Sequence, residues 1–394
     1  MDKHLRAVAA AMLLTAQSAA AQETVWVSLD RADAAAMKTA GILKENPLTT
    51  HGMEVLYEVS ARRLPVLSDF MHETFKRCAG FFAYRTRAEA EADLVAKAVT
   101  AAGPYTVDSQ SVVSPLSALV QEGSIRATIE ELSAFHTRYH SSDTGLDAAR
   151  WLEGRWKFLS RNRPGASVRL FAHDGWKQPS VVLTIPGSRK PDEIVVLGGH
   201  LDSIVRGGPP ERSPGADDNA SGIAVLTEAV RVLGESDVRF ERTVQFIGYS
   251  AEEVGLRGSQ DVAAQAAREG KKIIGVIQFD MTNYRGSGER IFLLTDFVDR
   301  DLTAFLGRLI DAYAGVPWST AACGYACSDH AAWTRKGFPA AAAFESSINE
   351  MNPALHTARD TLATTGGTAE HSVPFAKLAI AFAVEAAKTS SLSR

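Results

Sequence analysis

Histidine and carboxylate residues gather between Ile194 and Ser259, each beside a turn or a short apolar run. A lone Asp after a strand is usually a turn former or a helix cap. Several candidate ligands at such positions, not explained as surface salt bridges, favour metal binding instead. Imidazole and carboxylate groups suit zinc, and manganese or cobalt would also fit. The sequence therefore predicts most of a two-metal hydrolytic site, with these candidates: His200, Asp202, Asp217, Asp218, Glu252 and Glu253.

Short apolar runs before these residues predict strands that are buried on both faces. Three runs are each followed by candidate ligands: Ile194–Leu197 by His200, Val244–Tyr249 by Glu252 and Glu253, and Gly275–Phe279 by Asp280. A helical pattern from Ile223 to Leu233 separates the first two runs. This alternation implies a largely parallel sheet, in which ligands bind beyond the carboxyl ends of the strands. We therefore expect the three sets of candidates to meet at one edge of the sheet.

The candidate ligands can be divided between two metal ions. Asp217 lies in a loop between the others, so we expect its carboxylate to bridge the ions. His200 and Asp280 would complete one ion site, and His356 with one of the adjacent glutamates would complete the other. Asp202, two residues after His200, is expected to orient the imidazole ring.

The adjacent Glu252 and Glu253 indicate how a bound water would be activated. Two neighbouring side chains cannot easily reach one ion, so one glutamate should be a ligand and the other a general base. Bound metal lowers the pKa of water toward neutrality. The base would take a proton from the water and pass it to a leaving amine, while an ion and the Tyr325 hydroxyl stabilise the oxyanion. The predicted reaction is therefore hydrolysis of an amide bond.

The length and composition indicate a large packed domain together with a smaller unit. The 394 residues are 45% hydrophobic and carry a formal net charge of −4. No basic excess points to nucleic acid, and no charge run points to a disordered tail. The pattern over Val373–Lys388 predicts a closing amphipathic helix. We expect a monomer with neither nucleic-acid nor membrane partners.

The N-terminus has the pattern of a cleaved export signal. Lys3 and Arg6 precede the apolar run Ala7–Ala16, and a small-residue cleavage pattern ends at Ala21. The apolar run is too short to span a bilayer. A buried N-terminal helix is the alternative. We therefore predict a signal peptide at residues 1–21 and a secreted or periplasmic protein.

The chain has three cysteines. Cys323 and Cys327 lie four residues apart, and in an exported chain this spacing predicts a small-loop disulfide. A metal-binding pair is the alternative. Cys78 is left without a partner, and no odd thiol would remain if its region were removed on maturation.

Six motifs between Ser117 and Lys388 resemble, in order and spacing, those of one protein family. They are GGHLDS, PGADDNASG, AEEVGLRGSQ, QFDMTNY, CGYACSDH and NPALHT. They are similar to the motifs of the secreted bacterial leucyl aminopeptidases, within the co-catalytic dizinc exopeptidase family. The resemblance implies an α/β fold with a mixed, mainly parallel central sheet flanked by helices. It also implies two zinc ions and peptide substrates with a free N-terminus.

The same resemblance assigns roles to single residues. It implies that Asp217 bridges the ions, among the zinc ligands His200, Asp217, Glu253, Asp280 and His356. It implies Glu252 as the base and Asp202 beside the ligands, and the choice of Glu252 over Glu253 rests mainly on it. The family pattern further implies a Cys323–Cys327 disulfide beside the pocket and a cis peptide bond between Asp217 and Asp218.

Residues 22–106 contain a charged helical stretch at Arg85–Val99 and no cluster of ligand types. By the same resemblance, this segment corresponds to an N-terminal propeptide that assists folding and inhibits the enzyme within the same chain. The catalytic domain would then occupy residues 107–394. A permanent accessory domain is the alternative.

A set of apolar residues near the motifs is expected to form a substrate pocket for a Leu, Phe or Met side chain. Core packing is the alternative for each of its members, which are Met281, Leu294, Phe344, Ile348, Met351 and Leu355. Two other functions remain open. A glutaminyl cyclase shares this fold and uses one zinc, and a binding module would keep the fold without activity. The presence of all the expected ligands favours the aminopeptidase.

Overall fold

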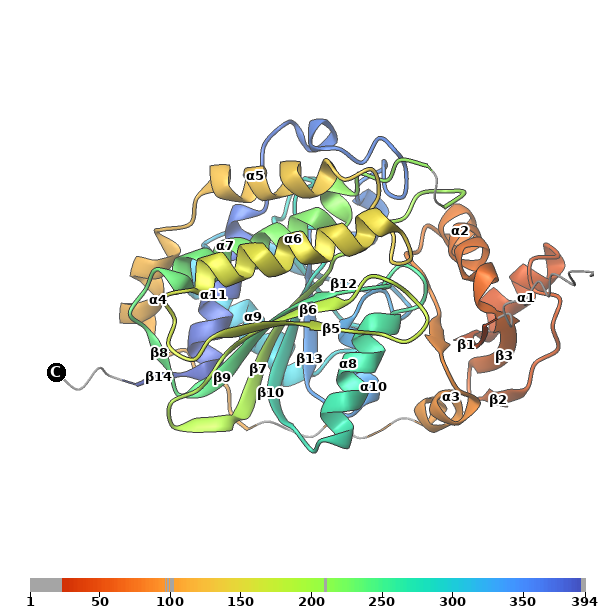
Figure 1. Cartoon of the computed structure of the whole chain (residues 1–394), viewed down its shortest axis with the longest axis horizontal. Coiled ribbons are helices and arrows are strands. Elements are labelled where there is room, and N and C mark those ends of the chain that lie inside the picture. The colour runs from red at the N-terminus through yellow and green to blue at the C-terminus, as the bar shows by residue number, and fades with distance from the viewer. Residues whose placement is uncertain (1–22, 96, 98, 100–102, 209–210, 391–394) are drawn as a thin grey trace, which may run out of the picture.

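The computed structural model describes residues 23–95, 97, 99, 103–208 and 211–390. The predicted signal peptide at residues 1–21 lies outside these ranges. Two α/β units follow one another along the chain, one before residue 95 and one after residue 103 (Figure 1). Within the described ranges, no helix combines the length and the apolar character needed to cross a membrane.

The larger unit is built on a mixed sheet whose strands, from one edge to the other, are β12 (Trp318–Ala321), β11 (Ile291–Leu294), β13 (Ala340–Phe344), β10 (Lys272–Phe279), β7 (Lys190–His200), β9 (Arg242–Tyr249), β6 (Ser180–Ile185) and β5 (Ser167–Phe171). The central strands β13, β10, β7 and β9 are parallel. Strands β6 and β5 run antiparallel to their neighbours, as β11 does to β13. The prediction of a mixed central sheet with parallel strands at its centre is confirmed.

Helices cover both faces of this sheet (Figure 1). Along β7, Val195 and Leu197 face one layer of helices, while Ile194 and Val196 face the other, because a strand has a period of two. The first layer contains α5 (Glu122–Ser133), α6 (Asp143–Ser160), α7 (Gly222–Gly234), α9 (Arg300–Leu309) and α11 (Val373–Ala387). The second contains α8 (Arg257–Arg268) and α10 (His330–Arg335). The central strands are therefore buried on both faces, as their apolar runs predict.

Helix α11 is not amphipathic, so this part of the sequence prediction is wrong. Thirteen of its fifteen residues are buried. It packs against α7, β7 and α4 (Gln110–Ser117), and a helix that is contacted on all sides needs no polar face. Its buried Glu385 accepts hydrogen bonds from the backbone N–H groups of Asp108 and Ser109, at 3.1 and 2.9 Å, just before α4 begins.

The smaller unit, which we call the N-terminal domain, is an antiparallel sheet with three α-helices among the described residues. The strand order is β2 (Thr49–His51), β3 (Glu54–Ser60), β1 (Thr24–Asp30) and β4 (Phe82–Tyr84), and the helices are α1 (Arg31–Thr39), α2 (Leu64–Phe75) and α3 (Arg87–Leu94). Met71 of α2 shares an apolar cluster with Ala251 and Val254 of the larger unit. The N-terminal domain therefore packs directly on the turn that carries Glu252 and Glu253.

Candidate metal centre

The predicted ligands meet at the carboxyl ends of neighbouring parallel strands, where such sheets bind ligands. His200 is the last residue of β7, and Asp280 follows β10 directly. His200 Nε2 lies 3.3 Å from Asp280 Oδ1. Glu252 and Glu253 come from the turn after β9 and are buried. The structure thus brings these four residues together at the carboxyl ends of the parallel strands.

Asp218 lies between two histidines. Its Oδ1 is 2.9 Å from His200 Nε2, and its Oδ2 is 3.2 Å from His356 Nε2. Glu253 Oε2 is 2.8 Å from the same nitrogen of His356. Two groups of possible ligands therefore share Asp218, with His200 and Asp280 on one side and Glu253 and His356 on the other. This is the arrangement that a bridging carboxylate needs.

Asp217, the predicted bridging ligand, does not point into this cluster. Its Oδ1 accepts a hydrogen bond from the Asn283 backbone N–H at 2.9 Å, and its Oδ2 accepts one from Asn352 Nδ2 at 3.1 Å. The cis peptide bond also lies one residue later than expected, between Asp218 and Asn219. The geometry therefore replaces Asp217 with Asp218 as the candidate bridge. Residue type cannot distinguish adjacent aspartates, and only the path of the backbone decides which one faces the histidines.

Asp360 holds the backbone of this aspartate loop. Its carboxylate oxygens accept the N–H groups of Asp217 and Asp218, each at 3.1 Å. Burial raises the pKa of Asp360 to about 8, and the neighbouring Asp217 charge adds to this effect. Asp360 was not among the predicted site residues. Its place four residues after His356 is the one signal in the sequence that would have indicated it.

Arg138 is a fully buried cation beneath the cluster. Its guanidinium donates to the backbone carbonyls of Leu201 and Gly215, both at 2.8 Å, and to that of Pro214. These carbonyls belong to the loop that follows His200 and to the loop that carries Asp218. Arg138 therefore ties the two ligand-bearing loops together. It stands outside every motif, so the sequence carries no signal for this role.

Asp202 supports both His200 and the glutamate turn. His200 Nδ1 lies 3.1 Å from the backbone carbonyl of Asp202 and 3.7 Å from its carboxylate. The same carboxylate accepts the backbone N–H of Glu252 at 3.0 Å and that of Glu253 at 3.3 Å. Asp202 thus contacts the ring mainly through its main chain, while its side chain fixes the turn that carries both glutamates.

Both glutamates occupy a site that suits cations. Burial raises the pKa of Glu253 to about 7, with the Asp218 charge adding to the effect, and burial also raises the pKa of Glu252 well above its usual range. Among the described residues, neither Glu252 Oε1 nor Glu253 Oε1 has a hydrogen-bond partner. Buried carboxylates without partners are costly unless cations lie among them. The imidazole and carboxylate donors therefore fit a divalent ion of the zinc type.

The two histidines respond to the same excess of negative charge. Burial by itself lowers the pKa of His200 and His356, but the adjacent carboxylates of Asp280 and Glu253 outweigh it and hold both pKa values well above the usual range. Protons and metal ions compete for the same imidazole nitrogens. A cluster that attracts protons this strongly also attracts metal cations.

Ser328 and Asp329 extend the polar network and were not predicted. The Ser328 hydroxyl donates to Asp280 Oδ2 at 2.5 Å, and Gln278 Nε2 donates to Asp329 Oδ2 at 3.0 Å. Burial raises the pKa of Asp329 to about 7. Both residues stand in the CGYACSDH motif, three and four positions after Tyr325, so the motif itself was the available signal.

The residues of the predicted substrate pocket gather in one apolar cluster beside the ligands. Four are buried and two lie at the margin of the cluster, namely Met281, Leu294, Phe344 and Leu355, then Ile348 and Met351. The predicted Cys323–Cys327 disulfide is formed and contributes to the cluster. Met281 directly follows Asp280, and Leu355 directly precedes His356. The apolar cluster and the candidate metal centre are therefore adjacent.

The N-terminal domain reaches both parts of this site. The Tyr325 hydroxyl accepts a hydrogen bond from the Cys78 backbone N–H at 3.0 Å. The Cys78 side chain packs against the apolar cluster. Its sulfur also belongs to a group with Asp218 and His356 whose possible ligand atoms lie within 4.8 Å of one another. No ligand in this domain was predicted from the sequence.

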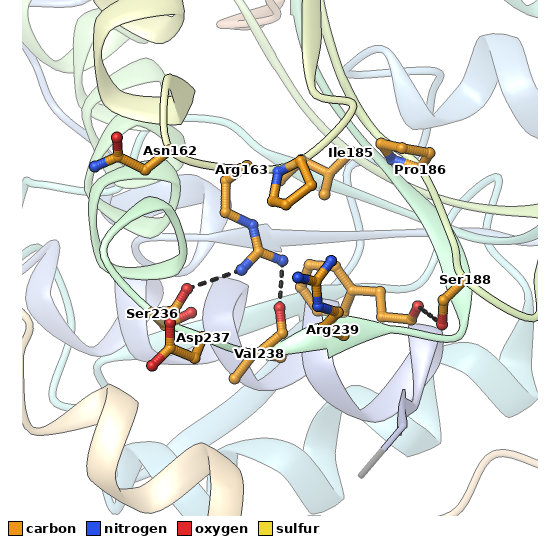
Figure 2. A pocket seen from close by; sticks show the side chains of 11 residues that line it. Asn162, Arg163, Ile185, Pro186, Ser188, Ser236, Asp237, Val238 and Arg239 are labelled. Atoms are coloured by element: carbon orange, nitrogen blue, oxygen red, sulfur yellow. Dashed lines mark hydrogen bonds between the residues drawn. The ribbon is translucent and has the colours of Figure 1, made fainter. Parts of the chain in front are cut away.

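A separate cavity of about 170 Å³ lies at the opposite end of the sheet (Figure 2). The Arg163 guanidinium, which points into it, donates to the carbonyl oxygens of Ser236, at 2.9 Å, and Val238. Ser188, also in its lining, is two residues before β7 begins. The eleven residues of β7 then extend roughly 30 Å to His200. This cavity is therefore not part of the candidate metal centre.

Residues 180–380 match the sequence model of a family described as Peptidase family M28. The chain belongs to peptidase family M28. The matched range contains all the candidate ligands from the larger unit together with Glu252, while the N-terminal domain precedes it.

Curated relatives of this chain are named as aminopeptidases. A probable leucine aminopeptidase of Arthroderma benhamiae is 37% identical over 323 residues, which cover 80% of this chain and 87% of the relative. Leucine aminopeptidase 1 of Uncinocarpus reesii is 37% identical over 299 residues, covering 72% and 74% of the two chains. Both relatives are fungal, whereas the resemblance of the six motifs was to bacterial enzymes. The resemblance to leucine aminopeptidases is confirmed at the level of the family.

Solved structures share the fold. The Legionella pneumophila LapA aminopeptidase aligns with a TM-score of 0.82 and 28% identity, covering 93% of this chain and 99% of the other. Residues 107–394 alone make up a smaller share of the chain than the 93% that is aligned. The alignment therefore extends into the N-terminal domain. A Porphyromonas gingivalis glutaminyl cyclase aligns with a TM-score of 0.55 and 17% identity, covering 67% of this chain and 98% of the other. That second likeness concerns the fold alone.

Proposed function

We propose that this chain is a metal-dependent aminopeptidase that removes Leu-type residues from the free N-terminus of peptides. The observation that carries the proposal is the Asp218 carboxylate, which faces His200 with one oxygen and His356 with the other. The apolar cluster beside these residues supports the preference for a hydrophobic side chain. Membership of peptidase family M28 and relatives named leucine aminopeptidases support the activity.

Two divalent ions, with zinc as the expected metal, would be held by residues of the larger unit. His200 and Asp280 would hold one ion, Glu253 and His356 the other, and Asp218 would contact both. When bound, such ions polarise the scissile carbonyl and lower the pKa of the attacking water.

Glu252 is the proposed general base. Its side chain is buried, and its raised pKa makes the carboxylate a stronger proton acceptor than an exposed glutamate. It would take a proton from the attacking water and give it to the leaving amine. Asp202 would keep Glu252 in place through the hydrogen bond to its backbone N–H, and the Tyr325 hydroxyl would donate to the oxyanion.

The test combines metal content with hydrolysis of a leucyl anilide, on wild-type protein and the Glu252→Gln variant after natural processing. We expect two ions per chain in both proteins. We expect activity to fall by about a hundred- to ten-thousandfold in the variant, the usual contribution of a general base. Glu269→Gln, at an exposed glutamate after α8, is the matched control and should keep full activity.

Other outcomes would contradict the proposal in distinct ways. A single ion per chain would favour a glutaminyl cyclase, and no ion would favour a binding module. An active Glu252→Gln variant with both ions bound would remove Glu252 from the role of base. A preference for lysyl or glutamyl over leucyl substrates would contradict the hydrophobic pocket.

We also propose that residues 1–21 direct export to the periplasm or the medium and are then removed, and that the protein acts as a monomer. Residues 22–106 would be a propeptide that assists folding and restrains activity. Support comes from the N-terminal domain, which contacts Tyr325 and the glutamate turn. Equal activity of the full chain before and after cleavage between residues 95 and 106 would contradict the inhibitory role.

A further inference from the structure

We propose that Cys78 of the N-terminal domain is a metal ligand that keeps the uncleaved chain inactive. Its sulfur would bind the ion held by Asp218 and His356. This inference rests on the proposed function, because it assigns a further ligand to the same metal centre. The Cys78 sulfur would be the atom through which the N-terminal domain closes the site.

The position of the Cys78 sulfur carries this assignment. The thiol lies in a group with Asp218 and His356 whose ligand atoms are all within 4.8 Å of one another. The other such group consists of His200, Asp218 and Glu253, so the two groups share Asp218. Among the described residues, Glu253 Oε1 beside them is buried and has no hydrogen-bond partner. The Cys78 sulfur thus lies beside buried carboxylates that favour a bound cation.

The turn after α2 brings Cys78 to this place. Helix α2 ends at Phe75, and Lys76, Ala79 and Gly80 then adopt left-handed backbone angles, with φ of 56°, 40° and 77°. The φ of 77° at position 80 favours glycine, because a side chain is strained in that conformation. The turn therefore projects Cys78 beyond the end of α2 and into the site.

Three contacts hold the turn against the larger unit. The Cys78 backbone N–H donates to the Tyr325 hydroxyl at 3.0 Å. The Arg77 guanidinium lies 5.0 Å from the centre of the Tyr325 ring. The His72 ring of α2 packs on the His356 ring with centroids 4.6 Å apart. The domain thus engages the proposed oxyanion donor and a candidate ligand at the same time.

The same turn packs against the apolar cluster of the proposed substrate pocket. Cys78 packs against the apolar cluster that contains Met281, Phe344 and Leu355. A peptide whose first side chain entered this cluster would overlap Cys78. Binding of the cysteine and binding of the substrate are therefore mutually exclusive.

The chemistry is a ligand exchange and needs no oxidant. The S–H bond breaks, its proton passes to solvent, and a bond forms between Sγ and the ion in place of a water. Cysteine thiolate is a normal zinc ligand, whereas the hydroxyl of serine keeps its proton at neutral pH. Cys78→Ser therefore removes the ligand with little change in volume, and Cys78→Ala provides a second variant.

The first experiment tests directly whether the Cys78 sulfur binds the metal. The full chain without residues 1–21 is loaded with Co²⁺ and its absorption spectrum is recorded before any cleavage. We expect a sulfur-to-cobalt charge-transfer band in the wild type and in Val66→Ala, a control at an exposed position of α2. The band should be absent from Cys78→Ser and Cys78→Ala.

The second experiment measures leucyl-anilide hydrolysis by the same uncleaved proteins. Both Cys78 variants should be at least tenfold more active than the wild type, and Val66→Ala should match the wild type. Metal-loaded wild type without the sulfur band would overturn the Cys78 assignment and leave the aminopeptidase intact. Absence of bound metal from the wild type, from every variant and from the cleaved protein would instead overturn the proposed function.

Discussion

At the scale of single residues, the candidate site depends on the direction of each buried carboxylate. Asp218 faces His200 and His356, while Asp217 faces Asn283 and Asn352. A carboxylate between two ion sites contributes to both of them. A carboxylate beside them only stabilises the loop that carries the ligands. The adjacent aspartates therefore have separable roles that substitution can distinguish.

We expect Asp218→Asn to lose both ions under conditions in which the wild type keeps them, because the substitution removes the charge that both sites share. Asp217→Asn should weaken metal affinity by only about ten- to a hundredfold, the usual effect of a residue beside the ligands. Elemental analysis after gel filtration measures both effects. Loss of the ions from Asp217→Asn and their retention by Asp218→Asn would restore Asp217 as the bridge.

At the scale of the elements, the strands that carry the ligands are tied together at their opposite ends. Glu193 of β7 accepts a hydrogen bond from Arg242 Nε of β9 at 2.5 Å and another from Lys272 Nζ of β10 at 2.8 Å. One carboxylate therefore links the three strands that end at the candidate site. Their relative positions decide whether His200, the glutamate turn and Asp280 can meet.

These hydrogen bonds lower the pKa of Glu193 from 4.5 to about 2. Because the folded-state pKa lies below the unfolded value, the stabilisation is complete above pH 4.5 and is lost as the pH falls through about 2. Glu193→Gln should lower the free energy of unfolding at pH 7 by about 1 kcal/mol. The difference from the wild type should shrink as the pH falls from 4.5 toward 2.

Urea unfolding of the wild type and Glu193→Gln at pH 7, 5, 4 and 3 would measure this difference. Glu211→Gln, at an exposed glutamate, is the control and should match the wild type throughout. A difference that stays constant over the whole range would show that the effect of Glu193 does not arise from its ionisation.

At the scale of the whole molecule, the N-terminal domain covers the carboxyl ends of the central strands, where the candidate ligands meet (Figure 1). Contacts away from the metal centre also hold it there. Lys336 Nζ pairs with Asp93 Oδ2 at 2.5 Å, and Arg257 pairs with Glu23 at 3.1 Å. The domain is therefore anchored at its margin as well as at Cys78.

Lys336→Gln should loosen this anchor. Asp93 is only 4% exposed, so removing its partner leaves a buried charge, at a cost of about 3–5 kcal/mol. We expect faster hydrogen exchange in α3, with unchanged exchange in β7, as measured by mass spectrometry of deuterium uptake. Lys271→Gln, in a surface pair with Glu269, is the control. Unchanged exchange in α3 would show that other contacts hold the domain.

The sequence by itself determined the kinds of residue in the candidate site and the strands that present them. The runs before His200, the glutamate pair and Asp280 predicted buried parallel strands, because strand periodicity is a property of neighbouring residues. Parallel strands bring their carboxyl ends to one edge, so the meeting of these residues followed from the same pattern. The disulfide and the apolar cluster followed from short spacings and motifs.

Only the tertiary structure decided which aspartate faces the histidines, and that α11 is buried on all sides. It alone showed that Arg138 and Asp360 hold the loops of the candidate ligands, and that Cys78 reaches the candidate metal centre. Each of these features depends on contacts between residues far apart in the sequence. Residue type and local spacing do not predict such contacts, because the direction of a buried side chain is set by the elements that pack around it.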